Sequence, residues 1–435
     1  MNDCLFFGYN DEPKLLKNKP DKITKPIQFK FENENEKKIK QISSSHYSTI
    51  FLFENGKAIE YLNKNDSKQN PEKIQIENIQ KVTVDGYNEA ILTIEGNVFA
   101  KGKDINPKNP NKFINISSLI KNKKDRVIQD IVSGRYSIYL LTSNHNAYGI
   151  GSNQFGQLGL KKSQKQSKKP ILIMKNVSKI FSGNSSKNVF LLNSNQELFV
   201  SGNNEYGQLG LEESIKEENI YKLTKIRNIP KGKIIDIQCG YYHSIMLIEN
   251  ENENPKRKLY SCGYYQFNGL GKDQNTYEFT EIKSSLFEND NIILEISCGD
   301  SHSLILTSKS KLIEFGYNQY GQLGTGDTNN QLIPIQIELP ELRFNENIYN
   351  YHLSCGYFNS FLYYSPFLSF SNLEEDLIKL FKRKEFCDIS FKTKNGEIIE
   401  AHKLILKYRL NQNQIEKLKE IISKNQLKNQ IKYLK

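Results

Sequence analysis

The side chains with the most evident chemistry recur as pairs at seven places along the chain. Each pair follows an aliphatic residue, two further residues and, in six of the seven copies, a glycine. In chain order the pairs are His46-Tyr47, Tyr87-Asn88, Arg135-Tyr136, Asn184-Ser185, Tyr241-Tyr242, Asp300-Ser301 and Tyr357-Phe358. Five of them contain an aromatic residue, and tyrosine and arginine often anchor protein interfaces. The chemistry indicated is noncovalent binding of a macromolecule.

Two interpretations of these pairs remain open. In the first, a protein partner contacts Tyr47, Tyr87, Arg135, Tyr136, Tyr241, Tyr242, Asp300, Tyr357 and Phe358. In the second, the same side chains only fill the space where the repeats converge. Joint replacement of Tyr87, Tyr136 and Tyr241 by alanine separates the two, because loss of binding with an intact fold favours the first and unfolding favours the second.

Other reactive side chains fit structural roles better than catalytic ones. The segment Gly321–Asp327 is glycine-rich, but it belongs to a repeated turn and lacks the Gly-x-x-x-x-Gly-Lys pattern of a phosphate loop. His243 and His302 occupy equivalent positions in successive repeats, which favours structural hydrogen bonds over a shared metal. The repeated cysteines Cys239, Cys298 and Cys355 fit small buried residues. We therefore expect no catalytic residue, no metal and no cofactor.

A repeating strand pattern must position these pairs. The pair motif recurs every 41 to 59 residues, and in the later copies a nine-residue glycine-rich segment follows it, as at Gly151–Gly159 and Gly316–Gly324. Each unit reads as strand, turn, strand, loop and strand. Seven such units predict an all-β seven-bladed propeller. We expect each pair on the turn that enters the innermost strand, so that the pairs ring one mouth of the central channel.

The glycine-rich segments predict tight reversals of the chain. Such a reversal needs a positive φ, which glycine adopts freely and asparagine tolerates. In the third copy Asn268 stands where the other copies have glycine, and we expect Asn268 to adopt that conformation. We expect the leucines of these segments to pack between blades; they are Leu158, Leu209, Leu270 and Leu323.

The N-terminal residues provide a means of closing the ring. The last unit, Leu353 to Tyr364, has a first strand but no second strand followed by a glycine-rich loop. Residues 4–10 look like the missing piece, since Gly8-Tyr-Asn10 matches Gly151-Ser-Asn153. We therefore expect residues 4–10 to complete the seventh blade and residues 1–366 to form the propeller.

Composition narrows the class of protein. No run of 18 apolar residues occurs, so no membrane span is expected, and the N-terminus lacks the pattern of a signal peptide. Six irregularly spaced cysteines fit reduced thiols in the cytoplasm, with the nucleus as the other option. The net charge of +11 is spread over a lysine-rich chain, which is not the footprint of a nucleic-acid-binding protein.

The repeats resemble those of the regulator of chromosome condensation family, whose members form seven-bladed propellers. The resemblance rests on Cys-Gly-x-x-His-Ser, at Cys239–Ser244 and Cys298–Ser303, and on Gly-x-Asn-x-x-Gly-Gln-Leu-Gly. It covers roughly residues 1–366 and is strongest in the four later blades. The absence of tryptophan disfavours WD repeats, and the absence of a Gly-Gly doublet disfavours kelch repeats.

The tail, residues 371–435, resembles the front half of a BTB/POZ domain. A helical pattern at Leu373–Phe381 precedes a strand at Phe386–Phe391 and a strand running into a helix from Glu397. The Asp and His of that family fall on Asp388 and His402. The later helices of the family have no counterpart, and its cullin contacts lie largely in that missing part. The resemblance implies a small α/β half-domain, and two explanations stay open: the gene product is truncated, or the half-domain needs a partner to bury its apolar face.

Two functions follow from these resemblances. The first is a non-catalytic scaffold or adaptor, in which the propeller binds a protein and the tail forms a homodimer or docks on a cullin-type ubiquitin ligase. The second is guanine nucleotide exchange on a Ran-like small GTPase, as in the founding member of the propeller family. Asp300 and His302 are available for exchange, but most repeats lack the histidine.

Overall fold

The structure is a computed structural model of the chain. It describes residues 4–10, 15–16, 19–31, 38–62, 71–215, 217–250, 255–288, 291–339 and 351–365, and the backbone of residues 389–392 and 398–401. The chain divides into two compact units, Met1–Ser365 and Pro366–Lys435.

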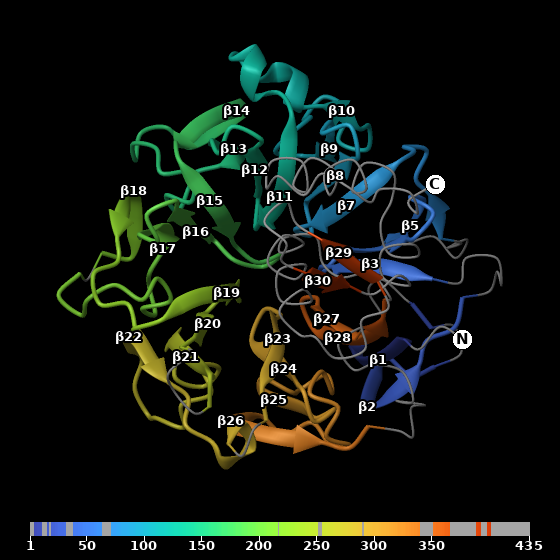
Figure 1. Ribbon diagram of the computed structural model, residues 1–435, viewed down its shortest axis with the longest axis vertical. Coiled ribbons are helices and arrows are strands. Elements are labelled where there is room, and N and C mark those ends of the chain that lie inside the picture. Colours follow the sequence, from blue (N-terminus) through green and yellow to red (C-terminus); the bar gives the residue numbers. More distant parts are fainter. Residues whose placement is uncertain are drawn as a thin grey trace. The chain divides into compact units, whose positions relative to one another are not determined.

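Seven antiparallel four-stranded sheets surround one axis in the first unit (Figure 1), which confirms the predicted all-β seven-bladed propeller. We number the blades 1 to 7 from β3. The innermost strands are β3 (Ile39–Ser44), β7 (Ile79–Val84), β11 (Ile128–Gly134), β15 (Val177–Phe181), β19 (Lys233–Cys239), β23 (Ile293–Cys298) and β27 (Tyr351–Cys355). The second strands are β4 (Ser48–Phe53), β8 (Asn88–Thr93), β12 (Ser137–Thr142), β16 (Asn188–Asn193), β20 (His243–Glu249), β24 (His302–Thr307) and β28 (Asn359–Tyr364).

Two further strands complete each blade. The third strands are β5 (Ala58–Leu62), β9 (Val98–Gly102), β13 (Ala147–Ser152), β17 (Leu198–Asn203), β21 (Arg257–Gly263), β25 (Leu312–Gly316) and β1 (Cys4–Tyr9). The outer strands are β6 (Glu72–Lys73), β10 (Ile114–Asn115), β14 (Gln166–Met174), β18 (Asn219–Lys225), β22 (Thr276–Glu281), β26 (Gln331–Ile337) and β2 (Lys22–Gln28). Three short 3-10 helices, η1 (Ser117–Leu119), η2 (Lys123–Asp125) and η3 (Ser285–Phe287), lie between blades.

The prediction of three strands in each unit is wrong, because each blade has four strands. The apolar run Ser244–Ile248 lies in β20, the second strand of its blade, and β19 precedes it as the innermost strand. The sequence of β19, Lys-Ile-Ile-Asp-Ile-Gln-Cys, mixes polar and apolar residues and overlaps the pair motif, so its strand character is weak. The second strands are conspicuous because neighbouring blades cover both of their faces, and every residue of β12 or β24 is buried.

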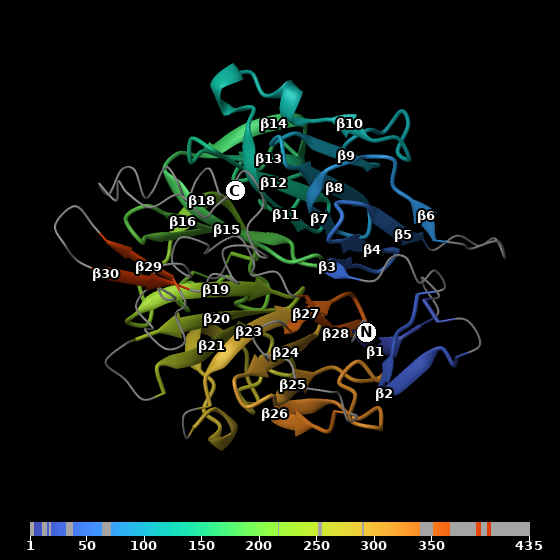
Figure 2. The same cartoon turned by 45° about the vertical axis from the view of Figure 1, so that its right-hand side comes forward.

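The N-terminus lies in the seventh blade. Strand β1 pairs with β28 on one side and with β2 on the other, and Gly8 lies opposite Asn359 (Figures 1 and 2). The rings of Phe6 and Phe361 lie 5.1 Å apart, and both side chains are fully buried. Two strands from each end of the propeller sequence therefore form one sheet.

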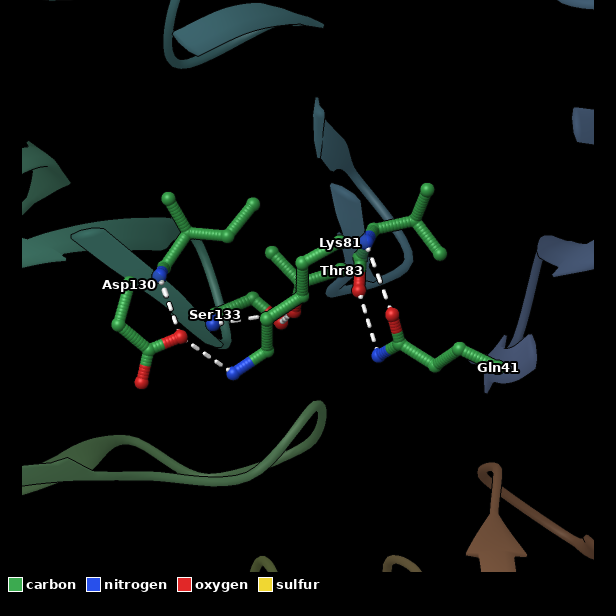
Figure 3. A network of polar contacts seen from close by, with 7 residues as sticks. Gln41, Lys81, Thr83, Asp130 and Ser133 are labelled. Carbon is green, nitrogen blue, oxygen red and sulfur yellow. Dashed lines mark hydrogen bonds and ion pairs between the residues drawn. The ribbon is translucent and has the colours of Figure 1, made fainter. Parts of the chain in front are cut away.

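Polar side chains join neighbouring innermost strands (Figure 3). The side-chain amide of Gln41 accepts from Val82 N at 3.0 Å and donates to Val82 O at 2.9 Å. Lys81 and Asp130 form an ion pair of 2.6 Å, and the hydroxyls of Thr83 and Ser133 lie 2.5 Å apart. The blades are thus held in register near the axis by directional bonds as well as by apolar packing.

The third glycine-rich segment departs from expectation. Asn268 does not adopt a positive φ, and Gly269 does, at +73°. The side chain of Asn268 instead accepts a hydrogen bond from Leu270 N at 3.1 Å, as Asn153 does from Leu158 N at 3.0 Å. In this loop Gly269 therefore takes the positive φ, and Asn268 makes the side-chain hydrogen bond that Asn153 makes in the first copy. Of the four leucines expected between blades, Leu158, Leu209 and Leu323 are fully buried, and Leu270 is partly buried.

The second unit contains an antiparallel strand pair, β29 (Ile389–Lys392) and β30 (Ile398–Ala401). In this pair Ile389 lies opposite Ala401. Asp388, His402 and the predicted helix at Leu373–Phe381 lie outside the described residues.

Candidate protein-binding site at the channel mouth

The predicted pairs lie on the turns that join each innermost strand to the second strand. The expectation that the turns enter the innermost strand is therefore wrong, because they leave it. Counted from the motif glycine or the residue in its place, the turn has three residues in six blades, as in Gly240–Tyr242 between β19 and β20. Figure 1 shows the ends of the innermost strands converging on the axis, and this convergence gathers the pairs from different blades.

Six glycines make room for these turns. The first residue of each second strand lies opposite a glycine of the third strand in every blade but the first, where Ser48 faces Leu62. The glycines are Gly8, Gly102, Gly151, Gly202, Gly263 and Gly316, with φ between +104° and +131°. A Cβ on Gly151 would lie 2.3 Å from Tyr136 O, and a Cβ on Gly263 would lie 2.3 Å from Tyr242 O. Only glycine permits this close approach. The glycine of the third strand therefore sets how near the carbonyl of each turn lies to that strand.

Two blades depart from the predicted pairing. In blade 2, Asp85 occupies the position of the motif glycine. The two turn residues that follow it are Gly86 and Tyr87, and Asn88 of the predicted pair begins β8. In blade 4 the turn has five residues, Gly183 to Lys187, and reaches toward other blades. The Asn184 amide donates to Ser44 O at 2.8 Å, and its oxygen accepts from the Ser133 hydroxyl at 3.0 Å.

Arg135 is the centre of the predicted set. Its guanidinium carbon lies 5.1 Å from the ring centre of Tyr241, 5.3 Å from that of Tyr136 and 6.0 Å from those of Tyr87 and Tyr357. These tyrosines come from blades 2, 3, 5 and 7. Each contact lies within cation–π range. We call these five residues the arginine cage.

A pocket of about 100 Å³ opens beside the cage. Its lining residues are His46, Tyr47, Asp85, Tyr87, Arg135, Ser185 and Tyr357. Four predicted site residues, Tyr47, Tyr87, Arg135 and Tyr357, therefore share one cavity. The side chain of Tyr47 is the most open of the predicted aromatics, with 37% of its surface exposed.

The remaining predicted aromatics belong to a second group. Tyr242 contacts Tyr206, Tyr264 and Phe267, and Phe358 stacks on Tyr320 with ring centres 4.5 Å apart. Tyr206, Tyr264, Phe267 and Tyr320 come from the glycine-rich loops. These loops therefore contribute aromatic surface beside the pairs, which the sequence interpretation did not assign to the site.

Charged groups around the cage have shifted pKa values. Burial lowers the pKa of Arg135. Its hydrogen bond to Tyr136 and the electrostatic effect of the surrounding tyrosines outweigh burial, so the pKa is raised overall. Burial raises the pKa of Asp300 to about 6 and that of Asp85 to about 7. Burial and Arg135 lower the pKa of Lys187 to about 8. Lys187 lies 4.2 Å from the Tyr241 ring centre and also donates to the Tyr241 hydroxyl.

Main-chain hydrogen bonds between blades hold the turns in place. Arg135 N donates to Ser186 O at 2.6 Å, Tyr241 N donates to Asp300 O at 2.8 Å, and Asp300 N donates to Tyr357 O at 3.3 Å. Asp300 is itself buried and accepts from the Ser301 hydroxyl at 2.8 Å. The surface is therefore preorganised, which reduces the entropy lost on binding.

The repeated histidines lie below this surface and link blades. His243 Nε2 lies 2.7 Å from the Ser303 hydroxyl, and His302 Nε2 lies 3.0 Å from the Ser360 hydroxyl. Both rings are fully buried, and burial lowers the pKa of each to about 3. The described cysteines, Cys239, Cys298 and Cys355 among them, are buried free thiols. Within the described ranges no group of His, Cys, Asp and Glu could hold a metal ion, and no helix could span a membrane.

Sequence reasoning missed two members of the site. Asp85 stands where other repeats have glycine, and its unusual identity at that position was the available signal. Lys187 lies at the end of the long blade 4 turn, and no periodicity marks a turn that is two residues longer than the others. His46 and Ser185 belonged to predicted pairs but not to the predicted binding set.

Comparison with known proteins agrees with the repeat architecture. Residues 195–247 and 311–362 match the regulator of chromosome condensation (RCC1) repeat, and residues 293–322 match a second RCC1 repeat profile. The chain therefore carries RCC1 repeats within a seven-bladed β-propeller.

Curated relatives match over part of their length. The probable E3 ubiquitin-protein ligase HERC4 of Homo sapiens is 28% identical over 231 residues, which are 52% of this chain and 21% of that protein. The ultraviolet-B receptor UVR8 of Arabidopsis thaliana is 31% identical over 159 residues, 37% of this chain and 34% of that protein. The chain thus spans about a fifth to a third of these relatives.

Solved structures share the fold. Prp20p from Saccharomyces cerevisiae superposes with a TM-score of 0.70 at 18% identity, over 87% of this chain and 94% of that one. Human WBSCR16 superposes with a TM-score of 0.69 at 17% identity, over 85% and 100% of the two chains. Identity at this level establishes the propeller and nothing about partners.

Proposed function

We propose that this chain is a non-catalytic protein-interaction scaffold whose propeller binds a protein partner at the channel mouth. The observation that carries the proposal is the arginine cage, in which tyrosines from four blades surround Arg135 beside an open pocket. Arginine and tyrosine dominate binding energy in protein interfaces. The turns are fixed by glycines and by main-chain bonds, so binding would cost little reorganisation.

The adaptor role extends this proposal to the tail. By its resemblance to a BTB/POZ front half, the tail would form a homodimer or dock on a cullin-type ubiquitin ligase. The similarity to HERC4, named as a probable ubiquitin ligase, is consistent with such a setting. A cullin pull-down with full-length chain and with residues 371–435 deleted tests this part, and equal recovery of cullin by both forms would contradict it.

The experiment for the channel mouth uses affinity purification with matched variants. Joint replacement of Tyr87, Tyr136 and Tyr241 by alanine should abolish recovery of specific partners, with the circular dichroism spectrum unchanged. The control replaces Tyr221 and Tyr277, which lie on outer strands β18 and β22, and should recover the same partners as the unmodified chain. Equal recovery by both variants would contradict the proposal.

A second candidate function is nucleotide exchange on a Ran-like GTPase. It is favoured by the shared fold with Prp20p, whose structural report describes binding to Gsp1p and histones. Release of labelled GDP from Ran at catalytic amounts of this chain would establish exchange and overturn the scaffold proposal. Release indistinguishable from the spontaneous rate would exclude it for Ran.

A further inference from the structure

We propose that the pocket beside the arginine cage binds the side-chain carboxylate of an aspartate or glutamate presented by the protein partner. This inference rests on the proposed function, since it names the chemistry by which the channel mouth would select its partner. It also assigns Arg135 as the anchor of that contact. Four observations carry it.

The first observation is a cation without a carboxylate. Among the residues that the structure describes, Arg135 enters no ion pair, whereas Lys101, Lys225 and Arg257 each do. Its Nε is buried and has no hydrogen-bond partner. Leaving a buried donor unsatisfied is unfavourable, and more so when the donor is charged. A ligand that accepts from this guanidinium would recover that cost.

The nearby acids do not meet this need. Asp85 accepts from Tyr87 N and Asn88 N at 2.8 Å each, and from the Asn88 side chain at 3.0 Å. Asp300 accepts from the Ser301 hydroxyl. Neither carboxylate is within ion-pair distance of Arg135, and burial raises both of their pKa values toward neutrality. Lys187 lies close to Tyr241 as a second cation of the cage region, and the charges of Glu205 and Asp300 act on it.

The second observation is the set of neutral donors. The pocket lining includes the hydroxyl-bearing side chains of Tyr47, Tyr87, Tyr357 and Ser185. Burial raises the pKa of Tyr87, but hydrogen bonds from Tyr136, Tyr47 and Arg135 outweigh burial and leave that pKa below its ordinary value. Surroundings that stabilise a phenolate stabilise a carboxylate for the same reason, because both present anionic oxygen to donors.

The third observation is size. By the same measure of volume, one water needs about 10–15 Å³, so a pocket of about 100 Å³ admits a group of several heavy atoms. A carboxylate with its methylene stem fits this space, and the aromatic walls suit the stem. Arginine recognises carboxylates through a planar fork of N–H groups, and the Nε of Arg135 is the member of that fork left without a partner.

The fourth observation is support from behind the arginine. The five-residue turn of blade 4 supplies Ser185 to the pocket and Ser186 O to the main chain of Arg135. Asn184 anchors this turn to blades 1 and 3. The longer turn therefore holds the arginine in position before any ligand arrives, as a binding site for a small charged group requires.

The test follows the Nε–Hε NMR signals of the full chain, which has seven arginines. N-acetyl-glutamate amide is titrated at constant ionic strength, with N-acetyl-glutamine amide as the neutral isostere. The Arg135 signal, identified by its loss in Arg135→Lys, should shift saturably with the glutamate probe only. Arg257, which already donates to Glu249 at 2.9 Å, is the internal control and should not shift.

Variants and a second anion decide between outcomes. Tyr87→Phe keeps the ring and removes one hydroxyl, and it should weaken glutamate-probe binding severalfold; Arg135→Lys should weaken it at least tenfold. An Arg135 signal that does not move with the glutamate probe overturns the inference. Tighter binding of inorganic phosphate than of the glutamate probe also overturns it, in favour of a phosphorylated partner.

Failure of the inference and failure of the proposed function give different results. If the triple tyrosine variant loses its partner but the glutamate probe never reaches Arg135, the scaffold proposal stands and the carboxylate is wrong. If the probe binds at Arg135 and the triple tyrosine variant still recovers every partner, the pocket chemistry stands and the proposed function is wrong.

Discussion

The side-chain amide of Asn184 donates a 2.8 Å hydrogen bond to the main-chain oxygen of Ser44, 140 residues away. Asn184 belongs to blade 4 and Ser44 to blade 1, so this bond crosses the axis of the propeller. Ser44 in turn donates to Asn359 of blade 7 at 3.0 Å, and Asn184 accepts from Ser133 of blade 3 at 3.0 Å. Asn184 of blade 4 is thus bonded directly to blades 1 and 3, and through Ser44 it is linked to blade 7.

Asn184→Ala should destabilise the whole propeller. Two partly buried hydrogen bonds are lost and their partners are left unsatisfied, so the free energy of unfolding should fall by roughly 1–3 kcal/mol. Urea unfolding measures this change. Asn228→Ala removes only an exposed 3.4 Å contact to Glu278 and serves as the control. Equal stability of the two variants would show that the cross-axis bond contributes nothing.

Deletion of residues 1–16 should impair the fold far from the N-terminus. It removes β1, leaves the edge of β28 unpaired and takes Phe6 from its contact with Phe361. We expect the thermal midpoint to fall by roughly 10 °C or more. A synthetic peptide of residues 1–31 added in trans should restore part of the loss. An unchanged midpoint after deletion would show that β1 does not close the ring.

Glu314 should make the propeller less stable as the pH rises. The side chain is fully buried in β25 without a hydrogen-bond partner, and burial raises its pKa well above the ordinary value of 4.5. The native state therefore holds a proton that the unfolded state releases above about pH 4.5. The stability advantage of Glu314→Gln over the unmodified chain should grow from pH 5 to pH 8, by up to about 1.4 kcal/mol per pH unit. A pH-independent difference would contradict this.

His243 should contribute to acid sensitivity in the opposite direction. Burial lowers its pKa to about 3, so below about pH 6.5 the unfolded state binds a proton that the native state refuses, and stability falls. The equivalent position in blade 7 is Asn359, so His243→Asn keeps the polar character of the position. We expect this variant to be less stable than the unmodified chain at pH 8, with the gap narrowing as the pH falls to 5. Thermal melts at both values measure it.

Lys101→Met should be strongly destabilising. Lys101 lies 2.7 Å from Glu60 of blade 1 and 3.0 Å from Glu89 of its own blade, and all three side chains are largely buried. Burial and repulsion by Glu60 already raise the pKa of Glu89. Removal of the cation leaves two buried carboxylates uncompensated, at a cost of about 3–5 kcal/mol in the free energy of unfolding. Urea unfolding measures this loss, and a triple variant that combines Lys101→Met with Glu60→Gln and Glu89→Gln should recover much of it.

The ring of seven blades could be predicted from the sequence because its periodicity shows which structural units repeat. The glycines that recur, such as Gly151 and Gly263, recur because each lies under the carbonyl of a pair-bearing turn. Features that occur in one blade alone could not be predicted from this periodicity. Blade 4 carries two extra turn residues, Asp85 replaces a glycine, and Gly269 rather than Asn268 has the positive φ. The blade 4 turn bonds to blades 1 and 3, which becomes known only when the ring is assembled, whereas Asp85 and Asn268 make hydrogen bonds within their own blades.

The arrangement of the seventh blade has a consequence for the order of synthesis. Strand β1 leaves the ribosome before its partner β28, which follows roughly 350 residues later; at 5–20 residues per second this is a delay of about 20–70 s. During that interval the edge of β1 that will face β28 is open, and this apolar strand must avoid pairing with other chains. We infer that the nascent chain depends on chaperones until Asn359 meets Gly8.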